Sequence, residues 1–189
     1  MRTPPRFLLL GLLVPFAAAC SGIYAVGADV VRAPQLPEDL LARTIEARGI
    51  RTLVCLRAES PASAPSARAA IGTEVTFLRV PMSANRLPEP ATLLALWQIA
   101  ATAERPLLVH CKAGVDRTGL ASALFVLHDT GDLERARGEL ALIPFGHVAF
   151  TSTGAMDRVL ELYAPHHAAG TAFPDWVRTV YAAGFRSDP

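Results

Sequence analysis

Residues 106–120 read PLLVHCKAGVDRTGL, and their types and spacing suit chemistry on an anion. Cys111 follows a short apolar run, Arg117 comes six residues later, and an apolar helical pattern begins directly afterwards. A cysteine is nucleophilic as its thiolate, which a helix N-terminus, loop N–H groups and an arginine all favour. The same groups bind a tetrahedral dianion, because N–H donors collect at a helix start and a guanidinium pairs with two oxygens. The spacing therefore predicts attack by Cys111 on an oxyanion held by Arg117.

The neighbouring residues complete the predicted loop. Thr118 is placed to hydrogen-bond the sulfur when it becomes a leaving group, and Gly114 lets the backbone turn without a side chain blocking the pocket. His110 either orients the loop through a backbone hydrogen bond or ends a buried strand. The phosphate-binding loop is predicted to comprise His110, Lys112, Ala113, Gly114, Val115 and Gly119 around Cys111.

Length and composition favour one domain with a sizeable core. The chain has 189 residues, of which 51% are apolar and 19% charged, and its formal net charge is +1. This charge leaves no basic footprint for nucleic acid. The histidines have no partners at metal-ligand spacing, and the loop with Arg117 compensates phosphate charge, so we expect no metal and no cofactor.

Strands and helices alternate along the chain. We expect strands at 23–26, 30–32, 50–56, 75–80 and 107–110, helices at 38–48, 91–103, 118–128, 133–142, 156–163 and 175–183, and a loop or weak helix at 60–70. Such alternation predicts an α/β domain with a mainly parallel central sheet flanked by helices. Ligands bind beyond the carboxyl ends of such strands, where Cys111 lies.

Residues 1–20 predict a secretory signal. Arg2 and Arg6 precede an apolar run over 7–16, which is too short to span a bilayer comfortably, and three alanines precede Cys20. Cys20 in this setting resembles the lipidated cysteine of a bacterial lipoprotein box, with plain cleavage or an uncleaved anchor as alternatives. Each route exports the domain at 21–189, either to the periplasm or to a lipid anchor on a bacterial membrane.

The loop HCKAGVDRTG resembles the signature of the protein tyrosine phosphatase superfamily, His-Cys-x-x-Gly-x-x-Arg-Ser/Thr-Gly, at every fixed position. The CKAG start and RTG end look like the loop of the phosphatase and tensin homologue. From about Tyr24 to Tyr163, the stretches VVRAPQL, GIRTLVCLR, LRVP, FGH and AMDRVLELY are similar to bacterial atypical dual-specificity phosphatases. The resemblance implies the cysteine-phosphatase fold, with Cys111 forming a phosphocysteine, Arg117 binding phosphate and Thr118 assisting release.

These enzymes usually protonate the leaving oxygen with an aspartate on a loop upstream of the cysteine. Residues 79–86 in that region read RVPMSANR and hold no carboxylate. Asp116 is the favoured substitute, as acid or as activator of water, because myotubularin-type lipid phosphatases and some bacterial tyrosine phosphatases carry an aspartate at this place. A structural aspartate bonded to the loop or to a neighbouring arginine is one alternative for Asp116, and Glu89 as the acid is another.

Cys55 lies at the end of a neighbouring strand, where the tensin homologue has a cysteine that pairs with the catalytic one on oxidation. The resemblance implies a reversible Cys55–Cys111 disulfide, which would protect the thiolate from overoxidation, while a small buried strand residue is the alternative. Lys112 would line the pocket rim, where lipid-directed relatives contact a second phosphate. Val115 replaces the second lysine of the tensin-like inositide enzyme, which argues against highly phosphorylated inositides.

The leading interpretation is a cysteine-dependent phosphatase of the protein tyrosine or dual-specificity type. A phosphoinositide or other lipid-headgroup phosphatase of the same mechanism is the alternative. A rhodanese-like sulfurtransferase and an inactive phosphate-binding module are further alternatives. The expected partners are a phosphorylated protein or a phospholipid, with no nucleic acid. The chain is expected to be a monomer that an N-terminal lipid attaches to a membrane.

Overall fold

The computed structural model describes residues 22–70 and 73–185, so the expected signal segment and Cys20 lie outside it. Its strands are β1 (Tyr24–Ala25), β2 (Val30–Ala33), β3 (Thr52–Cys55), β4 (Thr76–Arg79) and β5 (Leu107–His110), in the sheet order β1-β2-β5-β3-β4. β1 pairs antiparallel with β2, and the other neighbouring strands are parallel. The mainly parallel α/β sheet is confirmed, and β5 has the bounds expected from sequence.

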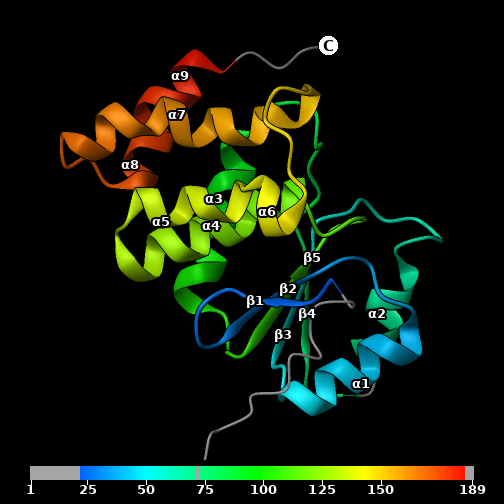
Figure 1. The fold of residues 1–189 in the computed structure, drawn as a ribbon. Helices are drawn as coiled ribbons and strands as arrows, with labels where there is room; N and C mark the ends of the chain where they lie inside the picture. The colour runs from blue at the N-terminus through cyan, green and yellow to red at the C-terminus, as the bar shows by residue number, and fades with distance from the viewer. Residues whose placement is uncertain (1–21, 71–72, 186–189) are drawn as a thin grey trace, which may run out of the picture.

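Helices cover both faces of the sheet (Figure 1). On one side lie α1 (Glu38–Arg48) and α2 (Ala64–Ala70). On the other side gather α3 (Pro90–Thr102), α4 (Asp116–Thr130), α5 (Leu133–Arg137), α6 (Leu142–Phe145), α7 (Ala155–Ala168), α8 (Phe173–Trp176) and α9 (Ala182–Gly184). Across the described ranges, no helix is long and apolar enough to cross a membrane.

Side chains of alternate residues in the central strands pack into two hydrophobic cores, one on each face of the sheet. Leu53 and Leu108 pack with α1 on one face, whereas Val54 and Val109 pack with α3 and α4 on the other. All four are fully buried, as expected for parallel strands that are covered on both sides. The sheet therefore holds the end of β5, and the loop that follows it, between two packed layers.

One expected helix is wrong and another begins earlier. The helix predicted at 133–142 ends at Arg137 and gives way to a 3-10 turn over Gly138–Leu140. Gly138, a poor helix former, stands where the α-helix ends, and the Glu139 carbonyl that follows accepts a hydrogen bond from a buried arginine of β2 at 2.7 Å. α4 begins at Asp116 instead of residue 118, which places that carboxylate in the first helical turn.

Candidate active site

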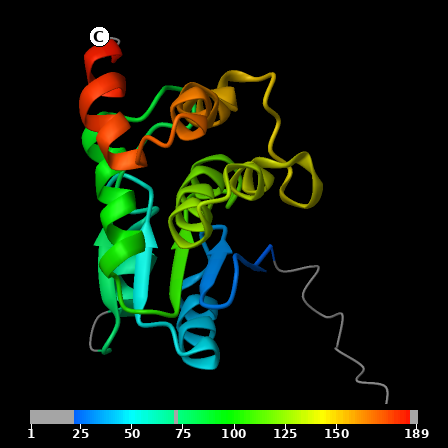
Figure 2. The ribbon, with the colours of Figure 1, turned by 90° about the vertical axis from the view of Figure 1, so that its left-hand side faces the viewer.

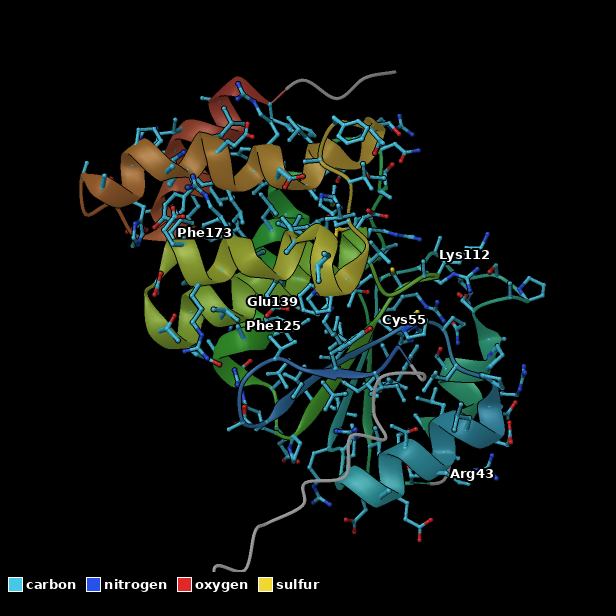
Figure 3. The ribbon with its side chains drawn as sticks, viewed as in Figure 1. Arg43, Cys55, Lys112, Phe125, Glu139 and Phe173 are labelled. Atoms are coloured by element: carbon cyan, nitrogen blue, oxygen red, sulfur yellow. The ribbon has the colours of Figure 1, made fainter. Side chains whose placement is uncertain are left out.

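The loop between β5 and α4 carries Cys111 at the carboxyl end of the sheet. The Cys111 side chain is almost fully buried, and its Sγ accepts a hydrogen bond from the Gly114 N–H at 3.2 Å. Val115 is the N-cap of α4, so the loop curls over the positive end of the helix dipole. Figure 3 shows Cys55 and Lys112 at this same end of the sheet.

The surroundings of the sulfur favour the thiolate. Burial raises the pKa of Cys111, but the Thr118 hydroxyl, the Arg117 charge and the N–H groups of Thr118 and Gly114 outweigh it and lower the pKa below its ordinary value. The Thr118 hydroxyl is buried and makes no hydrogen bond of ordinary geometry within the described ranges, so it remains available to the sulfur. Cys111 is thus arranged as a nucleophile.

Arg117 is the residue of the loop that borders a neighbouring cleft. Its Nη1 makes long contacts of 3.5 Å to the Leu56 carbonyl and 3.4 Å to the Met82 carbonyl. Its Nε is buried without a partner among the described residues. The cleft has a volume of about 890 Å³, and the segment 81–89 forms one of its walls. A guanidinium with an unused N–H edge in such a cleft suits a phosphate group.

His110 is buried directly before the cysteine. Its Nδ1 lies 3.1 Å from the carbonyl oxygen of Cys111, which a protonated Nδ1 can bond. Burial, reinforced by the charges of Arg57, Arg79 and Arg117, lowers the pKa of His110 to about 4. The imidazole is therefore neutral at physiological pH and acts as a donor to the loop backbone.

β2 supports the loop from below. Arg32 is fully buried, and its Nη2 donates to the carbonyls of Gly114 and Val115, each at 3.0 Å. Its Nη1 forms an ion pair of 2.9 Å with Glu139. Gly114 has φ +75, and a Cβ there would lie 2.7 Å from the carbonyl carbon of Ala33, so a larger residue would push the loop off β2.

Asp116 belongs to a network that joins three segments. Its Oδ1 lies 2.7 Å from Nδ1 of the buried His147, whose Nε2 lies 2.6 Å from Oδ2 of Asp157 in α7. A neutral imidazole has one N–H, so bonds at both ring nitrogens need a second proton on the ring or on a carboxyl group. Oδ2 of Asp116 makes no hydrogen bond to a described residue, and the side chain is 24% exposed, so this oxygen can meet water.

The other residues singled out from sequence lie around this centre. Glu89 is exposed at the start of α3 and, like Arg86, borders the cleft. Lys112 is exposed but is not among the residues that line the cleft. Cys55 pairs in register with His110 on the adjacent strand, and Cys55 and Cys111 are both free thiols. Within the described part of the chain, no cluster of three or more His, Cys, Asp or Glu side chains suits a metal ion.

Sequence reasoning missed the long-range partners of the loop. Arg32, in the otherwise apolar VVRA, is a charged residue in a strand that the sheet buries, and such a residue needs a partner. That signal was present, but nothing local pointed to Glu139. His147 and Asp157 lie in FGH and AMDRVLELY, two stretches that carry the family resemblance, but no spacing or periodicity pointed to their network with Asp116, which depends on the path of the chain between α6 and α7.

A family comparison agrees with this site. The sequence model described as "PTP-SAK: Swiss Army Knife protein, DSP-PTPase phosphatase domain" matches residues 18–160. No curated protein matches the chain.

Solved structures share the fold. TpbA of P. aeruginosa is 22% identical, with a TM-score of 0.60 over 78% of this chain and 91% of TpbA, and a TpbA variant is known in complex with pTyr. PTPMT1 in complex with PI(5)P is 18% identical, with a TM-score of 0.59 over 80% of this chain and 99% of PTPMT1. The core catalytic domain of the S. cerevisiae PP-IP phosphatase SIW14 is 18% identical, with a TM-score of 0.57 over 77% of this chain and 92% of that domain.

Proposed function

The chain belongs to the PTP-SAK family of DSP-PTPase phosphatase domains, and from this premise we propose how its own residues hydrolyse a phosphomonoester. The Cys111 sulfur attacks phosphorus, and the bond from phosphorus to the leaving oxygen breaks. Water then attacks the phosphocysteine and releases phosphate and the thiolate. The observation that carries this proposal is the buried Sγ, 3.2 Å from the Gly114 N–H at the start of α4, beside Arg117.

Arg117 holds two oxygens of the phosphoryl group through its unused N–H edge, and the loop N–H groups hold the rest. Thr118 donates to the sulfur when the sulfur is expelled in the second step. A chromogenic aryl phosphate assay on the wild type and on Cys111→Ser tests this division. Turnover should disappear in Cys111→Ser, whereas a wild type without turnover would identify a silent phosphate-binding module.

Asp116 is our proposed proton donor to the leaving oxygen. It begins α4 next to Arg117, and His147 holds one of its oxygens and leaves the other free. General acids of this kind contribute about 10²- to 10⁴-fold to rate. Asp116→Asn should therefore reduce turnover strongly for alkyl phosphates and less for aryl phosphates with good leaving groups, while Glu89→Gln should do little. The reverse pattern would make Glu89 the acid.

The leading substrate class is phosphotyrosine or phosphoserine/threonine on proteins. TpbA, which shares the fold, is known in complex with pTyr. Phosphorylated lipid headgroups are the second candidate, because PTPMT1 is known with PI(5)P and the exposed Lys112 would face a charged headgroup. Initial rates on a panel of phosphopeptides and of phosphoinositides in vesicles would separate them.

We also propose that residues 1–20 export the domain and that Cys20 is lipidated. The basic start, the apolar run and the small residues before Cys20 support this proposal. Mass spectrometry of the mature N-terminus would show a diacylglyceryl cysteine in the wild type and none in Cys20→Ala. We expect a monomer, which light scattering of the purified protein would test.

A further inference from the structure

An apolar segment, residues 141–151, contains α6 and leads toward α7, and we call it the apolar loop. Between Glu139 and Asp157 the sequence holds no Asp, Glu, Lys or Arg. Three large apolar side chains in this loop face solvent, with exposed fractions of 62% for Leu142, 83% for Ile143 and 92% for Phe150. Three such side chains on one segment without Asp, Glu, Lys or Arg are a candidate interaction surface.

The apolar loop is held in place by the rest of the molecule. The buried His147 fastens it to α4 and α7. The Phe145 ring lies 3.7 Å from the Arg32 guanidinium. Backbone groups are partly paired within the loop, because the Gly146 N–H donates to the Leu142 carbonyl at 2.7 Å. The apolar side chains therefore project from a supported framework, and fewer backbone groups would be left unpaired in an apolar medium.

The N-terminal end of the described chain lies on the same side. The Tyr24 ring meets Phe145 edge-on at a centroid distance of 5.3 Å. Figure 2 shows β1, in blue, and the yellow to gold segment between α6 and α7 on one side of the molecule. Cys20 is four residues from Tyr24, a span of at most about 14 Å in an extended chain. A membrane attachment through Cys20 or through the apolar run at 7–16 would thus hold this side near the bilayer.

We propose that the apolar loop docks on a lipid bilayer, with Leu142, Ile143 and Phe150 at the boundary between headgroups and acyl chains. No exposed ionised side chain of the loop has to leave water on docking, so no desolvation cost of a charge opposes it. The apolar area that the three side chains bury then favours binding to the bilayer. Because His147 joins the loop to Asp116, docking would also set the phosphate-binding loop close to the headgroups. The proposal applies whichever phosphomonoester the active site hydrolyses.

Depth-dependent fluorescence quenching tests the proposal on the processed, purified protein. Phe150→Trp and the matched control Val180→Trp are reconstituted on vesicles of phosphatidylcholine and phosphatidylglycerol whose phosphatidylcholine acyl chains are brominated. Val180 is also apolar and exposed, at 44%, but belongs to the π-helical turn between α8 and α9. Phe150→Trp should be quenched well beyond both the wild type and the control. Quenching no greater than in Val180→Trp would overturn the proposal.

A second variant separates the bilayer from other occupants. Combined Leu142→Ser, Ile143→Ser and Phe150→Ser should weaken partitioning to these vesicles by at least about tenfold, while soluble aryl phosphate turnover stays within about twofold. Leu40→Ser, elsewhere on the surface, should leave partitioning unchanged. A difference spectrum, Phe150→Trp minus wild type, that is already blue-shifted without vesicles, in the monomer or in a dimer, would assign the loop to the N-terminal segment or to a second copy and refute bilayer docking.

Discussion

Replacement of Arg32 by methionine removes the buried cation that supports the phosphate-binding loop. Its two terminal nitrogens bond the carbonyls of Gly114 and Val115, the Glu139 carbonyl and the Glu139 carboxylate, over 2.7–3.0 Å. Removing one partner of a buried ion pair costs about 3–5 kcal/mol, because the other charge is left without compensation. The side chain of Glu139 is 14% exposed, so water can recover little of that loss. We therefore expect Arg32→Met to lose about 3–5 kcal/mol of unfolding free energy.

Urea unfolding, followed by fluorescence of the buried Trp176, measures this loss. Arg43→Met is a matched control, since Arg43 (labelled in Figure 3) pairs with Asp39 on the surface at 2.8 Å and 70% exposure, and such pairs contribute about 0–1 kcal/mol. The double variant Arg32→Met with Glu139→Met should recover much of the loss, because no unpaired charge remains. If the unfolding free energy of Arg32→Met lies within about 1 kcal/mol of the wild-type value and its kcat/KM is unchanged, the reasoning is refuted.

Three further outcomes follow from the site. Thr118→Val should raise the pKa of Cys111, so the pH profile of its alkylation by iodoacetamide shifts to higher pH; an unchanged profile would show that the hydroxyl does not serve the thiolate. Burial lowers the pKa of His110 to about 4, so the unfolded chain binds a proton at this residue at a higher pH than the folded protein does. The free energy of unfolding should therefore fall by about 3 kcal/mol, through this group, as the pH falls from about 6.5 through 4. The wild type should lose that much more than His110→Gln over this range, and equal losses would contradict the assignment. Mild peroxide should give a Cys55–Cys111 peptide that dithiothreitol reverses, whereas Cys55→Ser should be inactivated irreversibly; mass spectrometry that finds no such peptide would end the hypothesis.

Sequence patterns predicted best where local physics decides the structure. The helix at Glu38–Arg48 has its expected bounds, because its acidic first turn and the left-handed Gly49 at its C-cap are local signals. The strand Leu107–His110 has its expected bounds because an apolar run buried on both faces of a sheet needs no particular partner. The motif after this strand likewise predicted Cys111 and Arg117 beside the start of one helix. This prediction was possible because the two residues are separated only by the short loop between the strand and the helix.

Long-range contacts decided the rest. Glu139 stands in the 3-10 turn that replaces the end of the helix predicted over 133–142, and its partner Arg32 lies more than a hundred residues earlier. The hydrogen bond between His147 and Asp116 depends on how two distant segments pack, and no periodicity of the sequence predicts that contact. These residues position the loop, so the sequence motif predicted the reacting groups but not the contacts that keep them in place.

Rapid-quench mass spectrometry of the enzyme during turnover tests the central claim most directly. An acid-quenched reaction with an aryl phosphate should leave phosphate on the peptide that contains Cys111, and Thr118→Val should accumulate more of it because the thiolate leaves more slowly. Cys111→Ser should neither hydrolyse the aryl phosphate nor form a phosphocysteine. Steady turnover with phosphate on another residue, or undiminished turnover in Cys111→Ser, would contradict the account.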